Sequence, residues 1–343
     1  MRHFNWRRWF QAGLAAIVLA SPPPSGAATR LTVSSWAPHG HLLREALVAW
    51  CEELSLRSRG RVGCDLLDQP ISTLHEQLEA VERAAVDIAV AIHSLDPQRF
   101  VLTRLAELPL AGTTTEQSSV AFYQLWNKHL RRYREHKGLH VLTVFTQAPG
   151  QLFTTGRAVA QADDLSGLSL RTGGGIARQV LGSLSGLGVR EVLVPIAASL
   201  HAVEDHQLDG MLVTAENVFR YGLQNTLKYQ WELPGGLYRH SFSLVINEQV
   251  WKRLTRSERA VIAEVSGEAA ARIFGRAADQ YEANLQMRLA AQGVMVTQAT
   301  PAQVKRLARR IRVVEQAWVT AARERGLSNA AKILAEHRRR LAP

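Results

Sequence analysis

The chain has 343 residues, of which 46% are hydrophobic and 21% are charged. This composition excludes a disordered chain and is sufficient for two ordinary domains with their own cores. The formal net charge of +11 does not by itself indicate nucleic-acid binding. Lys and Arg are scattered among Glu and Asp, and the sequence holds neither a zinc-ligand spacing nor interleaved basic and aromatic residues.

Residues 1–28 have the organisation of a secretory signal peptide. A basic stretch, MRHFNWRRW, is followed by the apolar run AGLAAIVLA and by small residues that end at Ala27 and Ala28. The apolar run is shorter than the about 20 residues of a membrane span. We therefore expect cleavage and an exported, soluble protein; the alternative is an anchor retained in the mature chain. Arg7-Arg8 resembles part of a twin-arginine signal, which leaves the export route open.

The sequence that follows predicts a first α/β lobe. Apolar residues recur at helical spacing from Leu43 to Leu54, and the helix ends at Gly60. A βαβαβ order is typical of a mainly parallel sheet covered by helices. The expected elements are strands over 31–36, 62–67, 87–92 and 141–145, and helices over 43–60, 72–85 and 116–135.

The two cysteines, Cys51 and Cys64, lie on either side of the turn at Gly60. A helical rise of about 1.5 Å per residue and a strand rise of about 3.3 Å bring them to a similar height above that turn. A disulfide is compatible with an oxidising compartment, and two unpaired buried thiols are the alternative.

From Pro149 the pattern restarts and predicts a second α/β lobe. We expect lobe I to comprise residues 29–148 and 237–277, and lobe II to comprise 149–236 and 278–343, with a ligand cleft between them. The expected elements of the second half are an extended segment over 152–155, strands over 168–171, 191–195, 208–213 and 241–247, and helices over 175–184 and 197–205.

The longest predicted helix begins at a capping box formed by Thr255 and Glu258 and ends at Gly293. At 1.5 Å per residue it would run about 55 Å. It must therefore cross both lobes or bend between them, and Gly267 and Gly275 are the expected places to bend. A helix over 300–326 and a short one after Ser328 complete the chain.

The sequence offers no catalytic or cofactor motif. Gly173, Gly174 and Gly175 follow a strand, yet they satisfy neither dinucleotide-binding nor phosphate-loop spacing. Asp163 and Asp164 precede a turn, where capping explains them better than acid–base catalysis. Neither a nucleophile elbow nor an i, i+4 histidine pair of the metalloprotease kind is present. We expect a non-enzymatic protein without a cofactor, and we identify no metal-ligating residues; the sequence leaves open whether a cation binds together with the ligand.

Arg171 ends a predicted strand, directly before Thr172 and the three glycines. In α/β sheets, ligands bind at the carboxyl ends of strands. A guanidinium pairs bidentately with a carboxylate and stays protonated, and glycines let backbone N–H groups approach the same anion. From the residues alone, a solvated strand-end arginine is the alternative to a carboxylate-binding one.

Phrases along the chain resemble the solute-binding proteins of tripartite ATP-independent periplasmic (TRAP) transporters, the DctP family. The matching phrases are WAPHGH, SRGRV, RAAVDIAVA, DDLSGLSLRTGG, VPIAASLHAVEDHQLDG, NTLKY and INEQVWKRL, followed by the capped long helix. Their order covers roughly residues 30 to 340. The resemblance implies a two-lobe periplasmic binding protein fold with a long helix crossing both lobes. It also implies that Arg171 pairs with a ligand carboxylate.

The sequence departs from the family pattern in two places. Many relatives carry a second ligand-facing arginine where this chain has Gln151, and a polar run where this chain has MLVT after Gly210. Both changes make the site less charged. We therefore expect a monocarboxylate with an apolar or weakly polar body rather than a dicarboxylate, with Gln151 assisting Arg171.

Five further residues are candidates for the ligand site. Trp36 ends the first strand, where stacking on a ligand and packing in the core are alternatives. The others are His39, Val213, Asn217 and Phe219, and a helix-capping role is the plainer alternative for His39. A hinge is expected near Tyr238 and Phe242.

The expected function is that of a periplasmic receptor that closes around a small organic acid. By the resemblance, its partners are that acid and the integral membrane subunits of a TRAP transporter. The alternative is a binding module that presents its ligand to a membrane sensor kinase. We expect a monomer that does not bind nucleic acid.

Overall fold

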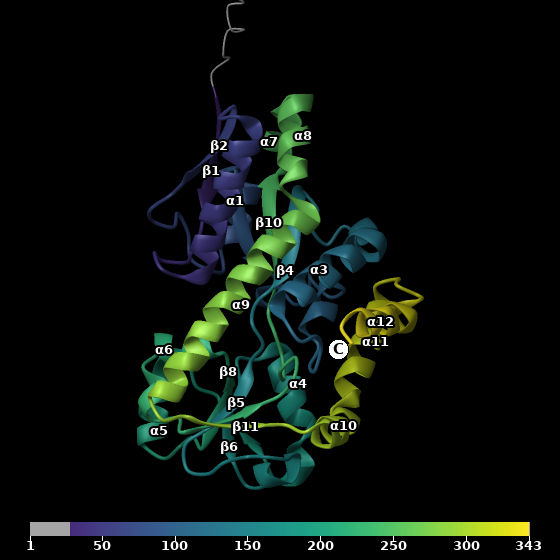
Figure 1. Cartoon of the computed structure of the whole chain (residues 1–343). Coiled ribbons are helices and arrows are strands. Elements are labelled where there is room, and N and C mark those ends of the chain that lie inside the picture. The colour runs from purple at the N-terminus through teal and green to yellow at the C-terminus, as the bar shows by residue number, and fades with distance from the viewer. Residues whose placement is uncertain (1–27, 343) are drawn as a thin grey trace, which may run out of the picture.

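The computed structural model describes residues 28–342, and it contains two β-sheets joined by a long helix, α9 (Gly267–Ala291) (Figure 1). The predicted signal peptide lies outside the described residues except for Ala28. Within the described part, no helix is both long enough and apolar enough to cross a membrane.

The first sheet has five strands in the order β2-β1-β3-β10-β4. β1 is parallel to β2 and β3, whereas β10 is antiparallel to β3 and β4. All seven residues of β10 are buried, because this strand is central and both of its faces are covered. The strands are β1 (Thr29–Ser34), β2 (Val62–Leu66), β3 (Ile88–Ile92), β4 (Leu139–Thr146) and β10 (Ser241–Asn247). The helices of this half are α1 (Leu42–Ser58), α2 (Gln77–Glu82), α3 (Thr115–Leu125), α7 (Glu248–Arg253) and α8 (Arg256–Glu264).

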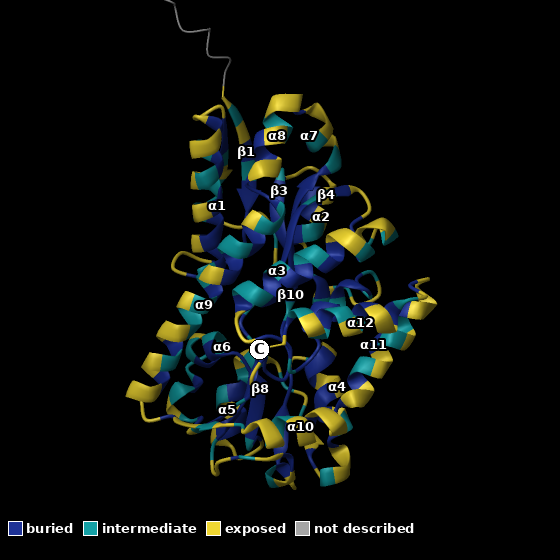
Figure 2. Cartoon of the chain, turned by 45° about the vertical axis from the view of Figure 1, so that its right-hand side comes forward, coloured by how far each residue is buried: buried dark blue, intermediate teal, exposed yellow. Residues whose placement is uncertain are grey.

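The second sheet has six strands in the order β11-β9-β5-β8-β6-β7. Its strands are β5 (Gln151–Thr154), β6 (Ser169–Arg171), β7 (Arg190–Glu191), β8 (Gly210–Val213), β9 (Tyr229–Glu232) and β11 (Met295–Gln298). Its helices are α4 (Gly175–Ser183), α5 (Ser199–Glu204) and α6 (Ala215–Arg220). The sequence did not predict β9 and β11, and the strand predicted over 191–195 is reduced to β7. In Figure 2 the buried strands of both sheets lie among helices whose outer faces are exposed.

The predicted long helix is wrong in one respect, because it is two helices. The capping box of Thr255 and Glu258 is present at the start of α8, which ends at Glu264. The backbone of Gly267 has φ +61, a left-handed conformation that interrupts a right-handed helix and favours glycine. Gly275 does not bend α9. A Cβ there would lie 2.5 Å from the Cα of Glu116, so this glycine allows α3 to approach closely.

α9 connects the two halves. Its first part contributes Ala270 and Phe274 to a core with the first sheet, and its last part contributes Leu285 and Leu289 to a core with the second. At 1.5 Å per residue, its 25 residues span about 37 Å. The chain also crosses between β4 and β5 and between β9 and β10, where Gly150 bridges Tyr238.

Three helices end the chain: α10 (Pro301–Arg310), α11 (Arg312–Glu324) and α12 (Ala330–Arg340). The helix predicted over 300–326 is therefore divided at Ile311. α11 packs on α4 of the second half, and α12 packs on α3 of the first. Because these helices touch both halves, the lobe boundaries given above stay a prediction.

A disulfide joins Cys51 of α1 to Cys64 of β2, with 5.7 Å between the two Cα atoms. The structure thus contains the bonded alternative of the two that the sequence left open.

Candidate functional site

A cavity of about 500 Å³ lies between the two halves and is lined by residues of both. The end of β1, the end of β3 and the start of β10 contribute from one side. β6, β8 and α6 contribute from the other. Arg171 is the last residue of β6, which lies between β8 and β7. The carboxyl ends of parallel strands meet at one sheet edge, and this arrangement brings Arg171 and Val213 to the same cavity.

Arg171 is buried but not neutralised. The residue is 8% exposed, and its Nε donates to the carbonyl oxygen of Val194 at 3.2 Å. Its other two nitrogens make no hydrogen bond or ion pair within residues 28–342. Burial lowers the pKa of Arg171, and Tyr238 and Tyr221 partly oppose that effect. An arginine stays protonated at neutral pH nonetheless. A desolvated cation therefore lines the cavity, and the N–H groups of its two terminal nitrogens are free to bind a ligand.

Two other buried ionisable groups of the cavity wall, Glu107 and Arg239, are held by protein partners, although the Nε of Arg239 has none. Glu107 is 1% exposed and accepts hydrogen bonds from the N–H of Ser241 at 3.2 Å and its hydroxyl at 3.0 Å. Burial raises the pKa of Glu107, although Arg104 opposes this. Arg239 donates to the carbonyl oxygens of Ala111 and Gln147 at 3.0 and 3.4 Å, and burial lowers its pKa to about 10.

His240 also lines the cavity in its neutral form. Its Nδ1 lies 2.9 Å from the hydroxyl of Ser94. Burial, together with the nearby Arg104, lowers the pKa of His240 to about 4. The ring is therefore uncharged at neutral pH.

Two contacts join α6 to the first half at the edge of the cavity. An oxygen of Glu216 lies 2.5 Å from Nε2 of His41. The guanidinium of Arg220 lies 5.9 Å from the centre of the Trp36 ring, within the range of a cation–π interaction. Both contacts bring residues of the two halves together around the same space.

Four of the seven residues that the sequence proposed line this cavity: Arg171, Trp36, Val213 and Asn217. The ring of Trp36 packs edge-on against His41, with 5.0 Å between ring centres.

The other three proposed residues do not line the cavity. The amide of Gln151 donates to the carbonyl oxygen of Leu233 at 3.1 Å and accepts from its N–H at 3.0 Å. Both polar atoms of this amide thus bond to Leu233, and its assistance to Arg171 stays a prediction. His39 is exposed and lies 3.7 Å from Asp68. Phe219 packs beneath Arg288, whose guanidinium is 4.1 Å from the ring centre.

Sequence reasoning missed several residues of the cavity wall, among them Glu107, Glu216, Arg220 and His240. Glu216 lies in the first turn of α6, three residues after β8, so the rule on strand ends could have indicated it, whereas Arg220 ends α6 and no such signal indicates it. Glu107 ends a 3-10 turn, Thr103–Glu107, and no motif in the sequence indicates it. Tyr238 and Phe242, expected at a hinge, line the cavity.

The fold and this site define the class of protein. A model of the family "bacterial extracellular solute-binding protein, family 7" (DctP) matches residues 33–320, and the chain belongs to that family. Solved structures of similar fold are TRAP periplasmic solute-binding proteins, which confirms the predicted family and the two-lobe fold.

Three similar proteins indicate the range of the family. A TRAP solute-binding protein from Bordetella bronchiseptica, solved with bound (R)- and (S)-mandelate, is 30% identical, with a TM-score of 0.80 over 91% of this chain and 98% of that one. One from Rhodoferax ferrireducens, in complex with copurified benzoate, is 24% identical, with a TM-score of 0.76 over 92% and 100%. A Comamonas testosteroni protein named outer membrane transporter protein TsaT is 29% identical over 95% of each chain.

Proposed function

We propose that this protein is a periplasmic receptor that captures a small aromatic monocarboxylate between its lobes and delivers it to the membrane subunits of a TRAP transporter. The observation that carries the proposal is the Arg171 guanidinium, which is buried in the wall of the cavity and keeps two nitrogens without a partner. An ionised carboxylate meets this need with two charge-assisted hydrogen bonds.

The rest of the wall supports a flat, apolar body for the ligand. Trp36, Phe242 and Tyr238 contribute aromatic surface, and Ile176 and Val213 contribute aliphatic surface. A volume of about 500 Å³ lies within the range of small-molecule sites. Relatives of the same family were solved with mandelate and benzoate, which are aromatic monocarboxylates.

Glu216 supports a single carboxylate on the ligand. Its carboxyl group belongs to the same cavity wall as Arg171. A second ligand carboxylate would be repelled by this like charge without gaining a free cation as well placed as Arg171. We therefore expect monoacids to bind more tightly than succinate or malate.

A ligand screen tests the proposal. The protein is unfolded and refolded to remove copurified ligand, and its unfolding is followed with mandelate, benzoate, succinate and malate. A ligand at 100 times its Kd stabilises the folded state by roughly 2.7 kcal/mol. Arg171→Ala should abolish the shift, whereas Arg178→Ala should keep it, because Arg178 is exposed and pairs with Glu191 at 2.9 Å. A dicarboxylate that stabilises more than every monoacid contradicts the proposal.

Delivery to a permease requires a test in cells. Deletion of the gene should abolish uptake of the acid found in the screen. If uptake persists and only the induction of genes by that acid is lost, the receptor serves a sensor kinase instead.

A further inference from the structure

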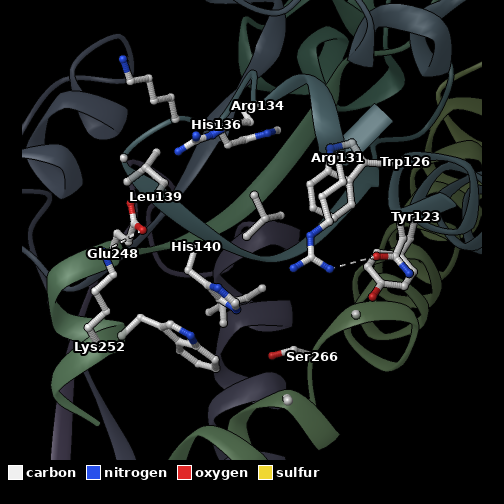
Figure 3. A pocket seen from close by; sticks show the side chains of 18 residues that line it. Tyr123, Trp126, Arg131, Arg134, His136, Leu139, His140, Glu248, Lys252 and Ser266 are labelled. Atoms are coloured by element: carbon white, nitrogen blue, oxygen red, sulfur yellow. Dashed lines mark hydrogen bonds and ion pairs between the residues drawn. The ribbon is translucent and has the colours of Figure 1, made fainter. Parts of the chain in front are cut away.

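A second cavity, of about 420 Å³, lies within the first half of the molecule and shares no lining residue with the cavity between the lobes. It is enclosed by the start of β4, by α7, by the segment after α3 and by the junction of α8 with α9 (Figure 3). Nothing in the proposed function uses it.

Two stacked rings form part of the lining of this cavity. His140 and Trp251 lie parallel within 10°, with 3.8 Å between ring centres. Burial, together with Arg131, lowers the pKa of His140 to about 4. The stack is therefore uncharged at neutral pH and presents a flat, largely apolar surface. Trp126, in the π-helical turn Trp126–Leu130 that follows α3, adds a further indole.

The amino end of α9 opens on the same cavity, since Ser266 and Gly267 both line it. Ser266 occupies the N-cap position in an extended conformation, yet its side chain makes no capping hydrogen bond. The residue is only 8% exposed, and its hydroxyl has no hydrogen-bond partner. A buried hydroxyl without a partner is unusual. The first N–H groups of a helix lack partners within the helix, and its amino end attracts negative charge.

The lining of this cavity also includes four positive side chains. Arg131, Arg134, Lys137 and Lys252 line the cavity, and all four are exposed. The one acidic residue of the lining is Glu248, which pairs with Lys252 at 3.0 Å. Figure 3 shows Arg131 beside Tyr123 on one side of the space and Lys252 beside Glu248 on the other. The cavity thus carries a net positive charge.

We propose that this cavity is a second binding site, which takes a small aromatic carboxylate at the amino end of α9. The carboxylate accepts a hydrogen bond from the Ser266 hydroxyl and lies in the field of the helix and of Arg131. The ring of the ligand packs against the indole surface of Trp251. This site would account for three observations together: the helix α9 has no side-chain cap, the buried Ser266 hydroxyl has no partner, and four cations line a cavity that also contains stacked aromatic rings.

Each cavity has its own tryptophan, which allows the two sites to be followed separately. Trp36 lines the first of these two cavities but not the second, and Trp251 lines the second but not the first. The protein is labelled with 5-fluorotryptophan, and the two fluorine resonances are assigned from Trp36→Phe and Trp251→Phe. Sodium benzoate is the probe, and benzamide is the neutral control of the same shape.

We expect benzoate to shift the Trp251 resonance with a saturable dependence, both in the unchanged protein and in Arg171→Ala. Benzamide should leave this resonance in place. The response of Trp36 reports the proposed function, because it should disappear in Arg171→Ala whatever happens at Trp251. No saturable shift at Trp251, or an equal shift with benzamide, overturns the second site.

Arg131→Gln and Arg132→Gln form a matched pair. Both remove one positive charge from neighbouring exposed positions, but only Arg131 lines the cavity. Loss of a charge-assisted contact should weaken benzoate binding at Trp251 roughly tenfold in Arg131→Gln and leave Arg132→Gln unchanged. Ser266→Ala should weaken it as well. Equal affinities in the two arginine variants overturn the proposal, because charge alone would then explain the binding.

Discussion

The cavity between the lobes and the cavity at the amino end of α9 both combine aromatic rings with arginine. In the first, Arg171 is 8% exposed and its guanidinium forms part of a buried wall. In the second cavity, the four cationic side chains of the lining are exposed to solvent. Water and salt compete with exposed charges and reach buried ones far less. We therefore expect the burial of a cation, rather than the number of cations, to determine how strongly and how selectively each site holds an anion.

Among the tests of this comparison, the largest effect on benzoate affinity is expected for Arg171→Lys. Lysine keeps the charge but lacks the planar pair of donors, so benzoate affinity at the first cavity should fall about 100-fold, which corresponds to about 2.7 kcal/mol. Isothermal titration calorimetry measures it, with Arg178→Lys as the exposed control. If Arg171→Lys binds within a few-fold of the unchanged protein, charge and not geometry holds the acid, and the contrast between the two cavities is lost.

The neutral His240 in the wall of the first cavity provides the next test. Burial lowers the pKa of His240 to about 4, whereas the unfolded chain has a histidine pKa near 6.5. The stabilisation by neutral His240 is thus complete above about pH 6.5 and is lost as the pH falls towards 4. Between pH 7 and 5 the loss is about 2 kcal/mol.

His240→Asn should therefore be less sensitive to acid than the unchanged protein by about that amount. The free energy of unfolding in urea at the two pH values measures the difference. The other buried histidines contribute equally to both proteins and cancel. Identical pH dependence in both would show that the wall of the first cavity tolerates a charged ring.

Salt should lower the benzoate affinity of the two cavities by different factors, and this effect is smaller than those above. Raising NaCl from about 50 mM to about 500 mM shortens the screening distance from roughly 14 Å to roughly 4 Å. Benzoate affinity should fall roughly tenfold at Trp251 and less than twofold at Trp36, because the carboxylate in the first cavity pairs with the buried Arg171, whereas the cations of the second are exposed. Fluorine spectra recorded along a titration give both values from one sample. Equal salt dependence at the two tryptophans would contradict the contrast.

The smallest expected effect concerns Arg220, whose guanidinium lies over the Trp36 ring, 5.9 Å from its centre. A cation–π contact at this distance contributes about 0.5–1 kcal/mol, so Arg220→Gln should weaken benzoate binding by about threefold. Arg288→Gln is the matched control, because Arg288 covers Phe219 within one half of the molecule. A loss as large as that of Arg171→Ala would identify Arg220 as a second carboxylate ligand.

The sequence predicted the elements that follow simple periodicity and the residues that stand at strand ends. Arg171 and Val213 are such residues. Trp36 and Asn217, close to the ends of β1 and β8, also reach the cavity. Gln151 does not, because its side chain bonds to Leu233, directly after β9. β9 was not predicted, so the competing partner could not be foreseen.

Helix geometry explains two further differences between the sequence predictions and the structure. Asn217 and Phe219 are two residues apart in α6, and such residues do not share a face, so only Asn217 reaches the cavity. The sequence indicated Gly267 as a place to bend, and the helix breaks there, but the apolar spacing continues through Val265 and so did not predict two separate helices. What ends the regular helix there is the backbone conformation of Gly267.

The bond between Cys51 and Cys64 bears on how the protein is prepared. It closes a loop with a sequence separation of 13, and a loop of that size contributes about 3 kcal/mol in the chain-entropy model. Protein produced in a reducing cytosol, or stored with a thiol reagent, lacks this contribution from α1 and β2 while Arg171, in the other sheet, is untouched. Melting temperatures from oxidised and reduced batches therefore describe two different molecules.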